Sequence, residues 1–287
     1  MNFDYQTVLN WHFDDVEQSY SEKDSILYAL GLGLGNDPDS LEQLKYLYEK
    51  QLQSFPTMAL ILGHPGAWMS NPKTGIDMLK VLHGDQHLEI HRELPSHGTV
   101  VGQNKIIDIL DKGSGKGALI FTQRQLFDKA TGDLLNTQKA LIFARGNGGF
   151  ERPPQTPHAP PPSIPEHPAE AYQDIPIAPH AALLYRLSGD YNPLHADPKV
   201  ALKAGFKKPI LHGLATFGVA ARAVLSSCAK QPTARLTHFN ARFSSPVYPG
   251  ETLRTEIWRQ ESKIIFRCKV LERDQIVLNN GTAQIAQ

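Results

Sequence analysis

The chain has 287 residues, 41% of them hydrophobic and 20% charged, and its 29 basic residues balance its 29 acidic ones. This composition is typical of a globular protein of one or two domains, and the zero net charge disfavours a nucleic-acid partner. Two cysteines, Cys228 and Cys268, and the lack of long apolar runs argue against a disulfide scaffold or a membrane-spanning helix. The first residues show no signal-peptide pattern and the last six no Ser-Lys-Leu type of address, so we expect a cytoplasmic protein.

The first half of the chain opens with a helical segment and continues with strand-like runs. The stretch "SILYALGLGLGND" (25–37) is typical of a helix that ends in glycines. Turn residues separate the later strand-like runs, which span residues 87–94, 99–112, 118–128 and 135–146.

Three motifs in this half resemble ligand sites but lack the necessary context. "GLGLGN" (31–36) follows a helix rather than a strand, so it indicates a helix end and not a dinucleotide loop. "KGSGKGA" (112–118) leads into a strand and lacks the Ser or Thr of a phosphate loop, which favours a hairpin turn. His83, His87 and His91 are four residues apart, but on a strand that spacing is roughly 13 Å. Such a separation is too long for a shared metal ion, and we expect none.

A proline-rich segment divides the chain. It holds eight prolines between Pro153 and Pro168, which favour an extended and semi-rigid connector. We therefore predict an N-terminal domain over 1–149, a linker over 150–174 and a C-terminal domain over 175–287. Short echoes occur in the same order on both sides of the linker and indicate two copies of one fold. They pair residues 25–37 with 181–193, and 91–100 with 243–253.

The second half contains a helix and a set of strands in that order. From Leu211 the apolar residues follow helical spacing, and small residues fill many of the remaining positions. The apolar stripe comprises Leu214, Phe217, Ala221, Val224, Leu225 and Cys228. Strand-like runs follow over 234–243, 251–260, 263–272 and 275–286. One helix followed by an antiparallel sheet, twice over, predicts an α+β fold.

The segment "SGDYNPLHADP" (188–198) contains the side chains best suited to acid–base catalysis. It cannot be a regular helix, because Gly189 and the Asn192-Pro193 pair interrupt it. A loop can direct Asp190 and His195 at one point, whereas residues five apart on a helix would be about 140° apart. Asn192 can hold the loop or hydrogen-bond a reactant. The pattern alone leaves two interpretations open, an acid–base pair or a helix cap beside a packed histidine.

The residues that follow favour the interpretation of Asp190 and His195 as an acid–base pair. His212-Gly213 stand at the start of the apolar helix, where free amides and a partial positive charge can stabilise an anion. A carboxylate, an imidazole and such a helix start suit reactions beside a thioester carbonyl. Four nearby lysines could meet a nucleotide's phosphates or form a solvated face: Lys199, Lys203, Lys207 and Lys208.

The stretch "YRLSGDYNPLHADPKVALKAGFKKPILHGLATFGVAAR" closely resembles the signature of the MaoC-like (R)-specific 2-enoyl-CoA hydratase type 2 family. The resemblance continues in "ARFSSPVYPGETL" and, in the first half, in "LKYLYEK", "VLHGDQHLEIHRELP" and "DILDKGSG". It implies a double hot dog fold, in which a helix is wrapped by an antiparallel sheet in each half. It also implies that the first half, with Gly33 and Pro38 in place of the acid and base, is non-catalytic and accommodates the acyl chain.

The family's functional residues can be carried over by position. The resemblance implies catalytic roles for Asp190, His195, Asn192, Gly213 and Glu49. It implies substrate contacts at His83, Gly84, Lys112, Tyr191, Pro193, Leu194 and Phe243. In the implied reaction, Asp190 and His195 hold a water molecule, and the Gly213 amide receives charge from the thioester oxygen.

The resemblance predicts a carbon–oxygen lyase that hydrates trans-2-enoyl-CoA to (3R)-3-hydroxyacyl-CoA in fatty-acid metabolism. No cofactor is expected, because the CoA thioester is itself the substrate, and no membrane partner is expected. A homodimer of double hot dogs is possible. The alternatives are a (3R)-hydroxyacyl dehydratase acting on acyl carrier protein, a hot-dog thioesterase and a non-catalytic acyl-CoA binding module.

Overall fold

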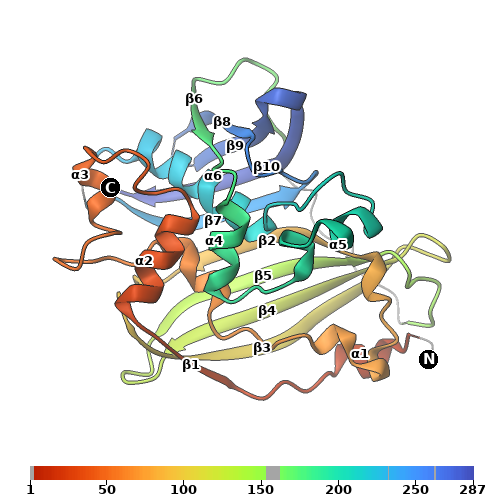
Figure 1. Ribbon diagram of the computed structural model, residues 1–287. Coiled ribbons are helices and arrows are strands. Elements are labelled where there is room, and N and C mark those ends of the chain that lie inside the picture. The colour runs from red at the N-terminus through yellow and green to blue at the C-terminus, as the bar shows by residue number, and fades with distance from the viewer. Residues whose placement is uncertain (1–2, 153–161, 232, 262) are drawn as a thin grey trace.

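The computed structural model describes residues 3–152, 162–231, 233–261 and 263–287 (Figure 1). Its strands form one antiparallel sheet, in the order β1-β3-β4-β5-β2-β7-β10-β9-β8-β6. Their bounds are β1 Val16–Tyr20, β2 Val81–Ile90, β3 Gly98–Asp111, β4 Ala118–Asp128, β5 Leu134–Ala144, β6 Ala171–Pro176, β7 Arg235–Phe243, β8 Thr252–Gln260, β9 Lys263–Val270 and β10 Gln275–Ala286. Eight of these strands were expected from the sequence, with bounds that differ by at most six residues, whereas β1 and β6 were not expected.

The sheet order shows the internal duplication. Counting outwards from the centre, the first half contributes β2, β5, β4, β3 and β1, and the second half contributes β7, β10, β9, β8 and β6. In each half the strand that comes first in the chain is outermost, and the second is at the centre. The two halves join where β2 pairs with β7, with Leu88 opposite Phe239. The predicted repeat is therefore a repeat of structure, and the two copies share one continuous sheet.

The helices are unequally distributed between the halves. The α-helices are α1 Tyr5–Leu9, α2 Glu22–Gly31, α3 Leu41–Leu44, α4 Ala181–Tyr185, α5 Pro198–Lys203 and α6 Gly213–Cys228. Short 3₁₀ helices are η1 Pro56–Ile61, η2 Trp68–Ser70, η3 Pro72–Thr74, η4 Met78–Lys80, η5 Arg186–Ser188, η6 Pro193–His195 and η7 Leu271–Arg273. No helix in the described ranges combines the length and the apolar character needed to cross a membrane.

Helix α6 forms the centre of the second half. It packs against β6, β7, β8, β10 and η1, and Figure 1 shows it lying against the sheet. Phe217, Ala221 and Val224 are fully buried, as the apolar stripe predicts. Because alanines fill many of the other positions, the sheet can approach the helix on several sides. The prediction of a helix wrapped by a sheet is confirmed for this half.

The helix predicted over residues 25–37 is present as α2, which ends at Gly31, but no helix in the described part of the first half is as long as α6. The position that α6 holds in the second half is taken by the six-residue 3₁₀ helix η1. Pro56 stands at its start, and Gly63, Pro65 and Gly66 follow within a few residues. Prolines and glycines in this density prevent a long α-helix.

The proline-rich linker is described only in part. Residues 153–161 lie outside the described ranges. Of the remainder, the Pro162 carbonyl accepts a hydrogen bond from Asn280, and the His167 carbonyl accepts one from the Trp258 indole. Strand β6 begins at Ala171, four residues before the predicted start of the second domain, and the two domain boundaries remain predictions.

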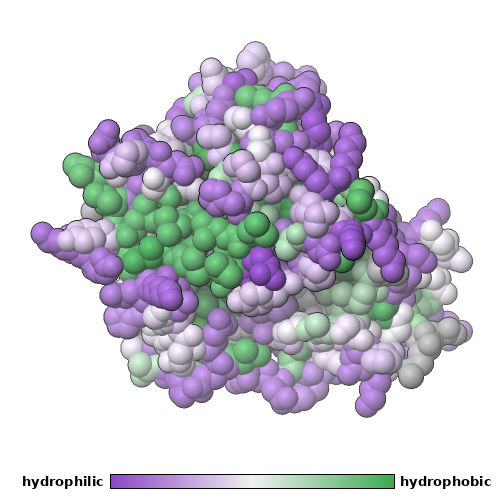
Figure 2. Space-filling model, in the orientation of Figure 1, coloured by the Kyte–Doolittle hydropathy of each residue, from purple (hydrophilic) through white to green (hydrophobic). Residues whose placement is uncertain are grey.

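Helices α2 and α4 cover the junction between the halves on one face. The hydrogen bonds of a capping box between Ser21 and Asp24 begin α2. Figure 2 shows apolar side chains gathered over these two helices, where Leu30, Leu183 and Leu187 are exposed.

Candidate active site

The Asp190–His195 loop is shaped by its own side chains. Helix α4 ends through η5 at Gly189, whose φ of 118° is a left-handed conformation that favours glycine. Asp190 Oδ1 then accepts a hydrogen bond from the Asn192 N–H at 3.2 Å, and Asn192 Oδ1 accepts one from the Leu194 N–H at 3.0 Å. These turns start η6 and direct His195 inward. The predicted loop role of Asn192 thus has a structural basis.

The orientation of His195 leaves one ring nitrogen for chemistry. The side chain is buried, and its Nδ1 lies 2.9 Å from the Ile210 carbonyl oxygen. A carbonyl can only accept, so Nδ1 carries the hydrogen and neutral His195 has a lone pair on Nε2. That lone pair can take a proton from water.

His212 connects the loop to helix α6. Its Nε2 lies 3.1 Å from the main-chain carbonyl oxygen of Asp190 and donates to it. Its ring stacks on His195, with the ring centroids 3.7 Å apart. Nδ1 of His212 is buried and has no partner within the described part of the chain. His212 therefore fixes the distance between the acid–base loop and the start of α6.

The side chains of Asp190, His195 and His212 converge. One ligand-type atom from each lies within 4.8 Å of the other two. Such spacing would admit a metal ion, but the two stacked rings are inclined by only 25°, so their lone pairs lie in two nearly parallel planes. A metal ion needs lone pairs that point at one centre. The arrangement suits a hydrogen-bonded water molecule better.

Burial keeps both histidines neutral near pH 7. It lowers the pKa of His195, against the opposing effects of the Ile210 hydrogen bond and the Asp190 charge. Burial, reinforced by the neighbouring His195, lowers the pKa of His212 to about 4. Neutral His195 can accept a proton at Nε2, whereas a protonated His195 could not.

The start of α6 supplies an amide beside this cluster. Gly213 is the first residue of the helix, and its N–H makes no hydrogen bond among the residues described. A Cβ built on Gly213 would lie 3.3 Å from the Phe243 ring. Phe243 in turn lies against His83 of β2, at 4.6 Å between ring centroids. The predicted residues Gly213, Phe243 and His83 are thus brought together from both halves of the chain.

The remaining predicted substrate contacts lie at various distances from this centre. Gly84 occupies a bulge in β2, between His83 opposite Ile142 and Asp85 opposite Leu141. Tyr191 and Pro193 are exposed on the loop itself, and Leu194 is half-buried there. Lys112 is exposed at the hairpin between β3 and β4, as "KGSGKGA" predicts. Their roles in substrate binding stay predictions.

Glu49 is not brought to the cluster. It lies exposed in the turns that follow α3, and no described contact joins it to Asp190, His195 or Gly213. Its segment packs near the far end of α6, because Lys45 and Tyr46 line a recess with Arg222. The catalytic role assigned to Glu49 therefore has no support in this geometry.

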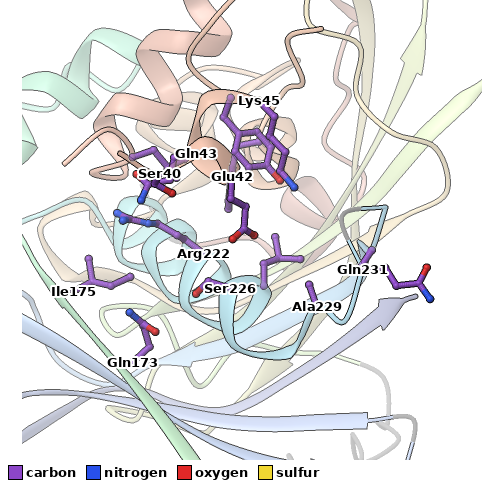
Figure 3. Close-up of a pocket in the computed structure, with 15 residues that line it drawn as sticks. Ser40, Glu42, Gln43, Lys45, Gln173, Ile175, Arg222, Ser226, Ala229 and Gln231 are labelled. Carbon is purple, nitrogen blue, oxygen red and sulfur yellow. The ribbon is translucent and has the colours of Figure 1, made fainter. Parts of the chain in front are cut away.

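That recess is separate from the Asp190 cluster. Figure 3 shows Ser40, Gln43 and Glu42 above α6 and Arg222 reaching towards them. Arg222 is nine residues from Gly213, which is about 13 Å along a helix. Its guanidinium donates to the carbonyl oxygens of Leu32 and Gly33 and so ends α2. The recess therefore belongs to the packing of the first half on α6.

The first half contributes two residues that the sequence did not single out. Arg124 of β4 is half-buried, with its Nε enclosed by protein, and its charge acts on His64 and His83. His64, in the loop after η1, is also close enough to Asp190 for their charges to interact. The sequence did not single out these residues, because "LGHPGAW" is typical of a turn and Arg124 belongs to an ordinary strand pattern.

Two family models match the chain. Residues 162–280 match the MaoC like domain, and residues 18–146 match the MFE-2 hydratase 2 N-terminal domain. The peroxisomal enoyl-CoA hydratase 2 of Arabidopsis thaliana is 36% identical over 96% of this chain and 94% of its own length. The chain belongs to the MaoC-like hydratase 2 family.

Further comparisons agree with this family and with the double hot dog fold. The peroxisomal multifunctional enzyme type 2 of Mus musculus is 38% identical over 92% of this chain, but the chain spans only 36% of that longer protein. A solved MaoC-like dehydratase from Phytophthora capsici is 33% identical and covers 99% of this chain and 98% of its own, with a TM-score of 0.85. A Mycobacterium tuberculosis protein of 14% identity, covering 99% of each chain with a TM-score of 0.58, is described as a double hotdog fold. The predicted fold and family are confirmed.

Proposed function

We propose that the chain catalyses the reversible hydration of trans-2-enoyl-CoA to (3R)-3-hydroxyacyl-CoA in fatty-acid metabolism. One observation carries the proposal. Asp190, His195 and His212 each place one ligand-type atom within 4.8 Å of the other two, and the residue after His212, Gly213, has an N–H that makes no hydrogen bond among the residues described. These are the groups needed to hold a water molecule and to receive charge from a thioester oxygen.

The reaction follows from the placement of these groups. The water oxygen bonds to C3 of the substrate, and the C2–C3 π electrons move towards the thioester carbonyl. The Gly213 N–H hydrogen-bonds to the oxygen that becomes negative. His195 Nε2 and Asp190 share the proton released by water, and the pair returns a proton to C2. The dehydration direction uses the same steps in reverse.

The neutral state of His195 is important to this scheme. A histidine that was already protonated could not accept the proton of the attacking water. Burial lowers the pKa of His195, so the base is available at neutral pH. No further group is needed to supply electrons, because hydration involves no net oxidation.

The basic residues beside the loop do not all remain available for a CoA phosphate. Lys208 donates to the Pro249 carbonyl and lies over the Tyr248 ring. Lys199, Lys203 and Lys207 have no such assignment, and their contact with a nucleotide stays a prediction.

Location and assembly are less constrained. The Arabidopsis and mouse relatives are named as peroxisomal proteins, so the comparisons give no support to the expected cytoplasmic location. A homodimer of double hot dogs also stays a prediction, which light scattering on the purified chain would test.

A hydration assay tests the proposed function. Loss of the conjugated enoyl absorbance should be followed with CoA thioesters of increasing acyl length, and with the same acyl groups on acyl carrier protein. We expect turnover on CoA thioesters and a product of the 3R configuration. Release of free thiol without loss of conjugation would instead identify a thioesterase, and faster turnover on the carrier protein would identify a dehydratase of fatty-acid synthesis.

A further inference from the structure

A cavity lies at the far end of α6 from the hydration chemistry. It has a volume of about 340 Å³ and is bounded by η1, β2, β5, β7 and the last turn of α6. Leu225, on its wall, follows Gly213 by twelve residues, which is about 18 Å along a helix. Neither Asp190 nor Gly213 is among the described residues that line it. The recess shown in Figure 3 adjoins it, because Tyr46, Leu225 and Ala234 line both spaces.

The cavity exists because η1 is short. In the second half the sheet packs on the sixteen residues of α6, whereas η1 has only six residues to cover the same part of the first half. Part of the inner face of β2 and β5 is therefore not filled by a helix. Apolar side chains form most of the wall that remains, including Leu52, Pro56, Ile90, Leu94, Leu225 and Leu236.

One buried amide interrupts this apolar wall. Asn136 of β5 lines the cavity and is only 2% exposed. Its partners in the sheet are Ile90 of β2 and Leu126 of β4, and directly opposed residues share one face of a sheet. Asn136 therefore lies between two apolar side chains, where an amide costs free energy unless its hydrogen-bonding groups have partners.

Hydrogen bonds fix which end of the Asn136 amide faces the cavity. Gln138 Nε2 donates to the Ala59 carbonyl oxygen at 2.7 Å, and a carbonyl can only accept, so the orientation of the Gln138 amide is settled. The same Nε2 donates to Asn136 Oδ1 at 2.9 Å. Asn136 Nδ2 remains, and it donates to no acceptor within the described part of the chain. Its two N–H donors are therefore presented to the cavity unpaired.

The charges around the cavity favour a neutral acceptor. The charged residues among its described lining are Arg92, Glu93 and Arg235, which are exposed and carry both signs. Arg92 is in addition paired with Asp133 at 3.3 Å. A carboxylate beside Asn136 would lose its hydration without gaining a counter-charge. A hydroxyl or carbonyl oxygen accepts the same hydrogen bond without that cost.

We propose that this cavity binds an aliphatic chain that carries a hydroxyl or carbonyl oxygen, and that Asn136 Nδ2 donates to that oxygen. The apolar wall buries the chain, and the hydrogen bond pairs donors that otherwise have no partner in apolar surroundings. Two sources present this chemistry, namely the distal part of a thioester's acyl group and a separate oxygenated lipid. The site takes no part in the hydration chemistry, so it does not depend on the proposed function.

The test compares octanol with octane, which has the same chain but no oxygen. In ¹H–¹⁵N spectra, the side-chain amide signals of Asn136 are assigned by their loss in Asn136→Leu. Octanol should shift these signals, whereas octane should shift the methyl signals of Ile90 and leave the amide unchanged. Octanol that binds without a shift of the Asn136 amide, or that does not bind, would overturn the proposal.

Affinities of three variants measure the hydrogen bond and the cavity separately. Asn136→Leu should raise the Kd of octanol by about tenfold, the worth of one neutral hydrogen bond, and change that of octane by less than about threefold. Asn36→Leu, at an exposed asparagine of the same half, is the matched control and should bind both as wild type does. Ile90→Phe should fill the cavity and weaken both probes, with thermal melts to confirm folding. Equal Kd values of octanol for Asn136→Leu and Asn36→Leu would overturn the proposal.

Competition with thioesters identifies the source of the chain. Hexadecanoyl-CoA has no double bond to hydrate, so it reports binding whatever reaction the protein catalyses. Displacement of octanol by hexadecanoyl-CoA, but not by acetyl-CoA, would assign the site to the acyl group of a thioester. Binding of octanol and hexadecanoyl-CoA together would assign it to a separate lipid.

Discussion

The imidazole rings of His195 and His212 stack on each other, with centroids 3.7 Å apart and planes inclined by 25°. Two imidazolium rings at this distance would repel each other strongly, so the pair can take up at most one proton beyond those of the two neutral rings. One ring belongs to the loop that carries Asp190, and the other caps helix α6 immediately before Gly213. The stack therefore couples the acid–base group to the amide that receives negative charge.

Replacement of the acid–base residues should abolish most of the activity. Asp190→Asn and His195→Gln should each lower kcat by about 100- to 10,000-fold, the usual worth of a placed acid or base. Each side chain retains its size, so thermal unfolding should change little. Hydration rates with a short and a long enoyl-CoA would check this, and near wild-type turnover in either variant would remove that residue from the mechanism.

His212→Phe should keep the stacked ring but lose the hydrogen bond to the Asp190 carbonyl. A neutral hydrogen bond contributes about 1 kcal/mol, so we expect kcat to fall by about fivefold to tenfold. His212→Ala should lose considerably more, because it also leaves a cavity beneath His195. Steady-state kinetics of the two variants, compared side by side, measure the two contributions. Equal losses would show that the ring stack has no effect on the position of His195.

The buried histidines should make the fold sensitive to acid. Burial lowers the pKa of His212 to about 4, whereas an unfolded histidine titrates near 6.5. Between these values the unfolded chain binds the proton more readily, so stability falls as pH decreases from about 6.5 towards 4. Near pH 4, this one group has lowered the free energy of unfolding by about 3 kcal/mol relative to neutral pH. Thermal melts between pH 5 and 8 should show the fall, and His212→Phe should show a shallower one.

Gly213→Ala should impair catalysis without unfolding the chain. The added methyl group would lie 3.3 Å from the Phe243 ring and would crowd the approach to the amide. We expect kcat/KM to fall by more than about tenfold, as for other changes at oxyanion donors. Phe243→Leu, introduced into the Gly213→Ala chain, should restore part of the loss. A fall in kcat/KM that Phe243→Leu leaves unchanged would place the cause elsewhere.

Arg124→Met should loosen the loop that carries His64. The variant leaves the carbonyl oxygens of Leu60 and Leu62 without their donors. Each buried unpaired group costs about 1–3 kcal/mol, so the free energy of unfolding should fall by about 2–5 kcal/mol. Chemical denaturation would measure this, with the exposed Arg145→Met as the matched control. Equal stability of the two variants would show that the loop has another anchor.

The elements that depend on local patterns could be predicted from the sequence. Alternating runs placed the strands, and the apolar stripe placed α6, because both periods are set by the main-chain geometry itself. The loop from Ser188 to Pro198 was also predictable, since Gly189 and Pro193 act through their own dihedral angles. The convergence of Asp190 and His195 then follows from the turns made by Asn192 and its neighbours.

The residues that were missed act across long separations in the chain. His64 and Asp190 are distant in sequence, and nothing in "LGHPGAW" indicates that the charge of Asp190 acts on His64. Arg124 acts through its hydrogen bonds to the main chain of η1 and the residue after it, which a strand pattern does not reveal for one polar residue. Glu49 was assigned by position in a motif, but the turns after α3 carry it away from the cluster. That η1 is a short 3₁₀ helix, whereas α6 is long, likewise shows only where Pro56 and the following glycines are read together.

The continuous sheet across β2 and β7 has a consequence for how such a protein can change over time. In a symmetric pair of identical half-length subunits, every substitution is made twice, so a change that benefits one pocket also alters its twin. Joining the copies in one polypeptide removes that restriction. One copy can then discard its long helix and its reactive loop, and specialise as a supporting wall, while the other keeps the chemistry.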